Sequence, residues 1–275
     1  MVVWLAEKFL AEGKRVAILS RGYRGRHGSS DEIALLKLRL GGSVRFGVGP
    51  DRFQEGRKLE EAEPVDVFLL DDGFQHLKLA RDVDIVMLDG SKKLQDDWLL
   101  PAGSLREPAG AWRRSDLLVV TRRFESIPIE ANDSRGLKLF YAQTRLLGFR
   151  RLGELGAPFF MSRGSTGPFF GFCGIGNPRA FFDDLRRWRL TLADTREFRD
   201  HHRYSQADAA LLELLAQKAG ATALLTTEKD EQNLREVKIA GLPAYVAVID
   251  LVLTQEAEFN QTLGRVLAER RGNRP

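Results

Sequence analysis

Short apolar runs alternate along the chain with segments of helical period. Val2, Leu5 and Phe9 recur at helical spacing and Gly13 is a typical helix stop, which predicts a helix ahead of the apolar run at residues 16–19. Similar runs follow at residues 65–70, 85–88, 117–120, 169–172, 223–225 and 245–249. Runs that are apolar throughout are typical of strands buried in a parallel sheet. The alternation therefore predicts an α/β fold with a doubly wound, mostly parallel sheet.

The alternation breaks between residues 121 and 159. There, polar connectors and the period-2 spacing of Leu137, Leu139 and Tyr141 predict a strand or hairpin in place of a further strand-helix unit. We expect this segment to link two lobes, one over residues 1–145 and a second, smaller α/β lobe over residues 146–275, and a chain of 275 residues is long enough for both. Residues 256–271 have the spacing of a C-terminal helix.

Composition and charge narrow the class of protein. The chain has 42 Lys and Arg against 38 Asp and Glu, a net charge of +4, and is 43% hydrophobic, which excludes bulk disorder and a histone-like polycation. A lone cysteine, Cys173, cannot form an internal disulfide and indicates a reducing, cytoplasmic compartment. No apolar run approaches the roughly 18 residues of a membrane span.

The basic residues favour one kind of partner over another. They are interleaved with acidic residues and lack an aromatic stacking platform, so nucleic acid is not an expected partner. Arginines beside tryptophan at residues 112–114 and 186–189 favour peripheral contact with an anionic membrane surface. Solvated helix faces are the alternative interpretation of the same clusters.

Candidate chemistry follows the ends of the predicted strands, where ligands gather in α/β sheets. The loop at residues 20–28 combines glycines with arginines that suit phosphate, or it is an ordinary solvated loop. The loop at residues 99–108 holds an Arg-Glu pair between two prolines, which is also typical of a rigid connector. Asp200, His201 and His202 form either an oriented imidazole or metal site, or a surface turn.

The end of the strand at residues 65–70 carries the most specific of these signals. Asp71 and Asp72 follow it directly, as in a Walker B element whose carboxylate holds Mg²⁺ beside a triphosphate. Asp-Asp-Gly is also favourable turn chemistry. Gln75 and His76 add further ligands or donors, which favours metal contact.

Taken together, a series of motifs resembles the tetraacyldisaccharide 4'-kinase family from the first helix to about residue 250. The motifs lie at residues 20–23 (Ser-Arg-Gly-Tyr), 30–32 (Ser-Asp-Glu), 51–52 (Asp-Arg), 71–76 (Asp-Asp-Gly-Phe-Gln-His), 100–103 (Leu-Pro-Ala-Gly), 105–108 (Leu-Arg-Glu-Pro), 174–178 (Gly-Ile-Gly-Asn-Pro), 200–202 (Asp-His-His) and 226–230 (Thr-Thr-Glu-Lys-Asp). The resemblance implies ATP-dependent phosphorylation of the 4'-hydroxyl of the tetraacyldisaccharide 1-phosphate precursor of lipid A, giving lipid IVA. It places this activity at the inner face of the cytoplasmic membrane, with residues 1–145 as a P-loop-kinase-like, nucleotide-binding lobe and the Asp-His-His motif on the second lobe.

The resemblance also implies roles for individual residues. Asp31 and His201 would be the catalytic pair that orients and deprotonates the sugar hydroxyl, and Asp71 and Asp72 would lie at Mg²⁺ and the phosphates of ATP. Nucleotide or substrate contacts are implied for Arg21, Glu32, Arg52, Gln75, His76, Arg106 and Glu107. These roles suit phosphoryl transfer, which depends mainly on positioning and charge neutralisation.

The sequence departs from the family pattern in two places. Ser30, and not glycine, precedes the Asp31-Glu32 pair. The strand and Gly-rich Walker A loop that family members carry before the first helix are missing, and no Gly-x-x-x-x-Gly-Lys-[Ser/Thr] occurs elsewhere. We therefore expect an N-terminally incomplete chain, whose own activity is left open. The alternatives are a P-loop-less family member that binds lipid or nucleotide without turnover, and a metal-dependent phosphohydrolase built on Asp71, Asp72, Asp200, His201 and His202.

Overall fold

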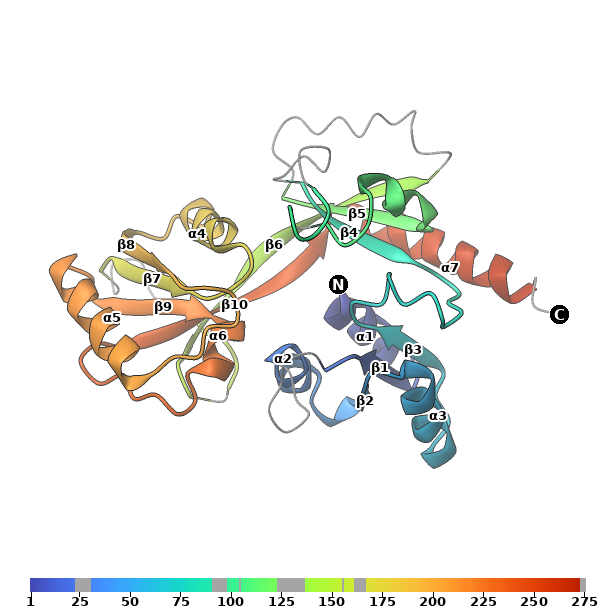
Figure 1. Ribbon diagram of the computed structural model, residues 1–275, viewed down its shortest axis with the longest axis horizontal. Helices are drawn as coiled ribbons and strands as arrows, with labels where there is room; N and C mark the ends of the chain where they lie inside the picture. The colour runs from blue at the N-terminus through green and yellow to red at the C-terminus, as the bar shows by residue number, and fades with distance from the viewer. Residues whose placement is uncertain are drawn as a thin grey trace. The chain divides into compact units, whose positions relative to one another are not determined.

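The computed structural model describes residues 1–22, 31–90, 98–103, 105–122, 137–154, 156–160 and 167–272 (Figure 1). The chain divides into two compact units. The first consists of Met1–Asp71 and Leu146–Asp250, and the second of Asp72–Arg145 and Leu251–Pro275. The expected lobe boundary at residues 145 and 146 is one of the points where the chain passes between the units. The assignment of nucleotide binding to residues 1–145 stays a prediction.

The first half of unit 1 is a three-stranded parallel sheet with helices between its strands. The elements are α1 (Val2–Ala11), β1 (Val16–Ser20), α2 (Asp31–Leu40), β2 (Val44–Val48), α3 (Arg52–Ala62) and β3 (Val67–Leu70). The strand order is β2-β1-β3, and every residue of the central strand β1 is buried. Helix α1 and strand β1 confirm the helix and strand predicted up to residue 19, and β3 confirms the strand predicted at residues 65–70. Gly13, with φ +72°, follows α1 as its predicted stop.

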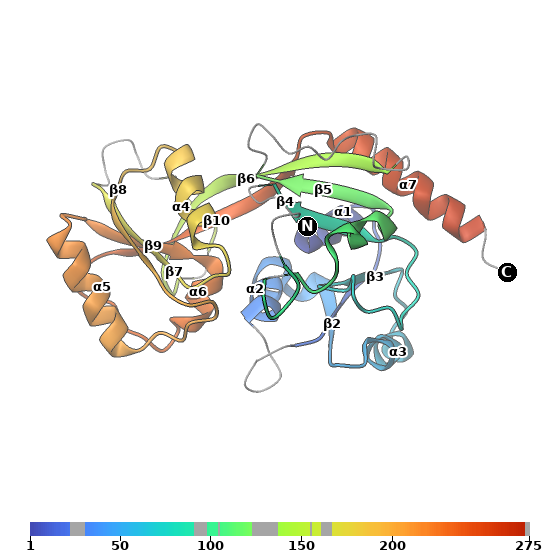
Figure 2. The same cartoon turned by 45° about the horizontal axis from the view of Figure 1, so that its top comes forward.

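The second half of unit 1 has helices on both faces of a parallel sheet. Its elements are β7 (Phe169–Cys173), α4 (Pro178–Arg187), β8 (Leu192–Glu197), α5 (Gln206–Lys218), β9 (Ala223–Thr227) and α6 (Glu228–Asn233). Alternate residues of β7 face opposite ways: Phe169 packs with Phe182 of α4, whereas Phe170 packs with Leu212 of α5. Helices α4 and α5 therefore cover opposite faces of β7 and β9 (Figures 1 and 2).

Unit 2 is built on the strands β4 (Ile85–Asp89) and β5 (Leu117–Thr121), with the helix α7 (Glu256–Gly272). β4 pairs in parallel with β5, and β5 pairs in parallel with β6 (Lys138–Arg151). Phe259 of α7 meets Phe140 of β6 edge to face, with ring centroids 5.1 Å apart, so α7 packs on this sheet through two fully buried rings. The predicted C-terminal helix is confirmed.

Two long strands run through both units. β6, which confirms the strand predicted near residues 137–141, lies next to β10 (Ala244–Leu253) in the seven-stranded order β4-β5-β6-β10-β9-β7-β8. Leu152 N–H donates to Ala244 O, and Thr254 N–H donates to Tyr141 O, both at 2.9 Å. Because the start of one strand meets the end of the other, β6 and β10 are antiparallel. The other pairings between strands in the described part of the chain are parallel, so the predicted α/β, mostly parallel fold is confirmed.

None of the helices in the described part of the chain combines the length and the apolar character needed to cross a bilayer.

Candidate active site

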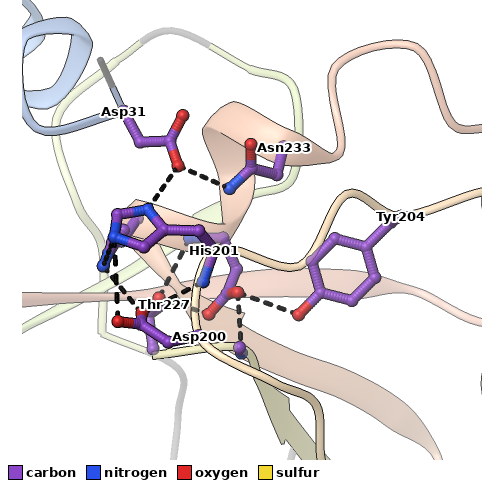
Figure 3. Close-up of polar contacts among 9 residues, drawn as sticks. Asp31, Asp200, His201, Tyr204, Thr227 and Asn233 are labelled. Carbon is purple, nitrogen blue, oxygen red and sulfur yellow. Dashed lines mark hydrogen bonds and ion pairs between the residues drawn. The ribbon is translucent and has the colours of Figure 1, made fainter. Parts of the chain in front are cut away.

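Unit 1 brings together two residues that are 170 positions apart in the sequence. Asp31 is the first residue of α2, and His201 lies in the loop between β8 and α5. His201 Nδ1 is 3.2 Å from Asp31 Oδ2 (Figure 3). The Nδ2 amide of Asn233, at the end of α6, donates to the same carboxylate oxygen at 3.0 Å. The pair expected from the sequence is therefore in hydrogen-bonding contact.

A partly buried ion pair holds α2 against the second half of the unit. The Arg39 guanidinium, near the end of α2, donates to the Glu228 carboxylate and to the Ile249 carbonyl. Glu228 is buried and is the first residue of α6. Because the ion pair ties α2 to α6, it places the first residue of α2 beside the loop that carries His201.

Two more charged groups lie at the other ring nitrogen of His201. Lys229 Nζ donates to Asp200 Oδ1 at 3.0 Å and is 3.5 Å from His201 Nε2. Asp200 Oδ2 is 3.7 Å from the same nitrogen, and Asp200 Oδ1 accepts a hydrogen bond from the backbone N–H of His201 at 3.0 Å. The imidazole therefore lies between the Asp31 carboxylate on one side and an ammonium-carboxylate pair on the other.

A fully buried carboxylate fixes the loops around His201. Asp230 accepts hydrogen bonds from the backbone N–H of Gly174 at 2.8 Å, from the Tyr204 hydroxyl at 2.8 Å and from the Thr227 hydroxyl at 2.6 Å. Gly174 follows β7, Tyr204 follows the Asp-His-His motif and Thr227 is the last residue of β9, so one side chain ties together three chain segments. Burial raises the pKa of Asp230, and the hydrogen bonds from Thr227, Gly174 and Tyr204 oppose this shift.

The second histidine of the motif has a structural role. His202 Nε2 is 3.2 Å from Asp208 Oδ2, and its ring stacks on Phe198 with centroids 4.5 Å apart. Asp208 also completes the capping box of α5 with Ser205. Of the two adjacent histidines, His201 is therefore the one that contacts Asp31.

The two aspartates after β3 have different surroundings. The backbone N–H of Asp71 donates to Leu19 O at 2.9 Å, which places Asp71 at the carboxyl end of the β1-β3 pair. Asp72 adopts a left-handed backbone conformation, with φ +50°, and its carboxylate accepts from Arg106 Nη1 at 2.6 Å. Both partners in this ion pair are exposed. Arg106, expected at an anionic group of nucleotide or lipid, thus pairs with one of the expected metal ligands.

Glu107 and Gln75 belong to a second polar cluster in unit 2. The Glu107 carboxylate forms a two-point ion pair with Arg114, whose guanidinium also lies over the Phe74 ring, 3.7 Å from its centroid. Hydrogen bonds from Arg114 lower the pKa of Glu107, and a hydrogen bond from Gln75 adds to this effect. Arg114 therefore links the 105–108 motif to the 71–76 motif, a role that the sequence did not indicate.

The remaining expected site residues lie at the ends of elements. Arg21 follows β1 and is exposed, and Glu32 is exposed in the first turn of α2. Arg52 is the first residue of α3 and is buried. The His76 carbonyl accepts from Arg81 Nη1 at 2.6 Å. Most of the glycine- and arginine-rich loop at residues 20–28 lies outside the described residues.

Mg²⁺ usually keeps several waters and is held by one or two carboxylates together with phosphate oxygens. The carboxylates of Asp71 and Asp72, which follow β3, are hard oxygen ligands of the kind that would suit such an ion. Within the described ranges, no group of three or more His, Cys, Asp or Glu side chains is arranged to hold a metal ion.

Lys229 and Asn233 were not assigned a role from the sequence. Lys229 belongs to the 226–230 motif, and its place directly after a predicted buried strand was a usable signal. For Asn233 the only usable signal was its spacing. It lies four residues after Lys229, which places both side chains on the same face of the segment if it is helical. Both side chains reach the Asp31-His201 pair.

Known proteins resemble this chain over nearly its whole length. The family model described as "Tetraacyldisaccharide-1-P 4'-kinase" matches residues 1–268. Proteins named tetraacyldisaccharide 4'-kinase from Geobacter metallireducens and Geobacter sulfurreducens are each 36% identical to this chain over 97% of its length, and the matches cover 83% and 79% of those proteins. A crystal structure of the "apo" form of LpxK from Aquifex aeolicus in complex with ATP is similar, with a TM-score of 0.68 and 27% identity, covering 97% of this chain and 82% of that one.

Proposed function

Because this chain belongs to the tetraacyldisaccharide-1-P 4'-kinase family, we propose that it transfers a phosphoryl group from ATP to the 4'-hydroxyl of the tetraacyldisaccharide 1-phosphate precursor of lipid A. The observation that carries this proposal is the contact between Asp31 and His201, which places a carboxylate and an imidazole from distant segments together. A carboxylate positioned by an imidazole can accept the proton of an attacking hydroxyl.

Asp31 is the proton acceptor in this proposal. Its Oδ2 is in hydrogen-bonding contact with both His201 and Asn233, and Figure 3 shows its other oxygen turned away from these two partners. The 4'-hydroxyl would donate to Oδ1 as its oxygen attacks the γ-phosphorus, and the bond to the β-γ bridging oxygen of ATP would break. His201 then orients the carboxylate and stabilises the charge on Oδ2.

Asp71 and Asp72 are proposed to hold Mg²⁺, whose charge would neutralise the phosphate oxygens of ATP. Asp71 supports this role because it lies where two parallel strands end, next to the start of the 20–28 loop. Asp72 is paired with Arg106, so metal contact by Asp72 requires that it share its carboxylate with this guanidinium or release it. Arg21, Arg52 and Arg106 keep their proposed roles as partners of anionic groups on nucleotide or lipid. Glu32, Gln75, His76 and Glu107 keep theirs as nucleotide or substrate contacts.

A lipid substrate requires access to a membrane, and we propose peripheral association with the inner face of the cytoplasmic membrane. Large apolar side chains of unit 2 support it: Leu77, Trp98, Leu99 and Leu100 are all exposed. Leu99 and Leu100 precede the 101–108 loop that carries Arg106, so an apolar segment lies beside a cationic one in the sequence. The tryptophan clusters support it less, because Trp188 packs against the core beneath α4.

The direct test is transfer of label from γ-³²P ATP to the disaccharide 1-phosphate in detergent micelles with Mg²⁺. Asp31→Asn and His201→Gln should each lower the transfer rate by at least a hundredfold, in the usual range for general acid-base groups. Asp194→Asn, on the exposed edge strand β8, is the matched control and should leave the rate unchanged.

The same assay separates the alternatives. Binding of the disaccharide without transfer at saturating ATP would contradict the proposal for this chain and favour a family member that holds its ligand without turnover. Phosphate release from a simple phosphodiester with Mn²⁺, unaffected by ATP, would favour the metal-dependent phosphohydrolase instead.

A further inference from the structure

Helix α6 presents two side chains, Lys229 and Asn233, to the Asp31-His201 pair. We propose that Lys229 and Asn233 are positioning residues: they hold His201 as a neutral imidazole with its proton on Nδ1, and they direct Oδ1 of Asp31 toward the acceptor hydroxyl. The role of Asp31 Oδ1 toward the hydroxyl rests on the proposed kinase function, whereas the state of the His201 imidazole follows from geometry alone.

The proton on Nδ1 follows from the two neighbours of the ring. An ammonium group has three N–H donors and no acceptor, so a ring nitrogen in contact with it must offer a lone pair. Lys229 Nζ is 3.5 Å from His201 Nε2, whereas the carboxylate of Asp31 faces Nδ1 at 3.2 Å and can only accept when ionised. The arrangement therefore pairs an Nδ1–H donor with Asp31 and an unprotonated Nε2 with Lys229.

Lys229 also limits the charge of the imidazole. Two carboxylates, Asp31 and Asp200, lie near the ring. The ammonium of Lys229 forms its ion pair with Asp200 at 3.0 Å on the same side as Nε2, so it offsets one of these charges. A neutral ring leaves Asp31 as the group that takes the proton from the hydroxyl.

Asn233 selects the oxygen of Asp31 that remains for substrate. Its amide donates to Oδ2 at 3.0 Å, the oxygen that already faces His201, so two donors share one carboxylate oxygen. This double contact fixes the rotation of the carboxylate. Oδ1 then points away from both donors, as Figure 3 shows.

The local sequence explains how a six-residue helix can be this precise. Lys229 and Asn233 are four residues apart and so lie on one face of α6. The Thr227 side chain caps the helix by accepting from the Asp230 backbone N–H at 3.1 Å, and the buried Asp230 carboxylate anchors it to β7 and Tyr204. Because Lys229 directly precedes Asp230 in the helix, this anchor holds the face with Lys229 and Asn233 against the imidazole.

The state of the ring can be read by ¹⁵N NMR of the full chain labelled at histidine, near neutral pH and without substrate. His201→Gln identifies the resonances of His201 among the four histidines. We expect a protonated, pyrrole-type Nδ1 and an unprotonated, pyridine-type Nε2. A proton found on Nε2, or on both nitrogens, would overturn the assignment.

Variants test the two residues separately. Lys229→Met should shift the Nε2 resonance toward the protonated range, Lys229→Arg should restore it in part, and Lys218→Met on the exposed end of α5 should leave it unchanged. Asn233→Ala should lower kcat about tenfold, the loss expected for one hydrogen bond to a charged group, with the KM for ATP unchanged. Gln261→Ala, on an exposed position of α7, is its control.

The two readouts keep this proposal separate from the kinase proposal. An unchanged Nε2 resonance in Lys229→Met, or an Asn233→Ala variant that raises only KM, contradicts the positioning roles even if the chain is an active kinase. A chain that shows the expected tautomer and its loss in Lys229→Met, but transfers no phosphate, supports the role of Lys229 and contradicts the kinase function.

Discussion

Replacing Asp230 with alanine should cost more stability than removing the hydroxyl of Tyr204, one of its three partners. Asp230→Ala leaves three donors in a buried site without an acceptor: the Gly174 N–H and the hydroxyls of Tyr204 and Thr227. An unsatisfied buried donor costs roughly 1–3 kcal/mol, and the variant also removes a carboxylate that is itself costly to bury, so we expect a net loss of about 3 kcal/mol.

Two milder substitutions give reference values for the loss in free energy of unfolding. Tyr204→Phe removes one of the three hydrogen bonds and should lower the free energy of unfolding by about 1 kcal/mol, in addition to any change in packing. Asp230→Asn keeps the shape and one acceptor, and the Thr227 hydroxyl can turn to accept from the new amide, so we expect a loss of about 1 kcal/mol. Urea unfolding followed by tryptophan fluorescence and circular dichroism measures all three.

The pH dependence tests the cause of the effect. Because burial raises the pKa of Asp230, the folded state holds this proton more tightly than the unfolded state does. The contribution is therefore fully present below the unfolded pKa of about 4 and is lost as the pH rises through the folded pKa. Asp230→Asn has no such loss, so its stability relative to the original chain should improve as the pH rises from about 4 to neutrality. A difference that stays constant or grows with pH, or an Asp230→Ala loss no larger than that of Tyr204→Phe, would refute this reasoning.

Three further outcomes are expected. Arg39→Met leaves the Glu228 carboxylate buried without its partner and should destabilise the chain by about 3 kcal/mol in urea unfolding, whereas the double variant with Glu228→Gln should recover part of the loss. Gly174→Ala would place a Cβ 3.0 Å from the Arg199 carbonyl and from His202 Cβ, so it should lower the transfer rate in the kinase assay more than Gly264→Ala in α7, where a Cβ meets nothing within 4 Å. Burial raises the pKa of the Cys173 thiol, so the folded chain should react with iodoacetamide far more slowly than the urea-unfolded chain, as mass spectrometry would show.

The pattern of apolar runs did not predict strands β2 and β8, for local physical reasons. β2 contains Arg45 and Gly47, and the side chain of Leu19 lies where a Cβ on Gly47 would stand, so close packing replaces the apolar run that marks a buried strand. β8 is an edge strand without a fully buried residue, and its sequence is correspondingly polar. Neither strand has an apolar run of its own, so each is identified only from its pairing with the neighbouring strand, β1 for β2 and β7 for β8.

The sequence by itself determined the features that depend on local order. Apolar runs marked the strands, and the polar residues after them marked candidate sites. Phosphoryl transfer was implied by the resemblance of the motifs around Asp31, Asp71 and His201 to a kinase family. These inferences are possible because burial and turn chemistry act over a few residues.

Only the tertiary structure decided which of those side chains meet. The contact of Asp31 with His201 depends on the Arg39-Glu228 ion pair between α2 and α6, which spans 189 positions. The same packing brings Lys229 and Asn233 to this pair and turns His202 toward Asp208. Long-range pairing follows from strand order and helix packing, which no periodicity within one segment encodes.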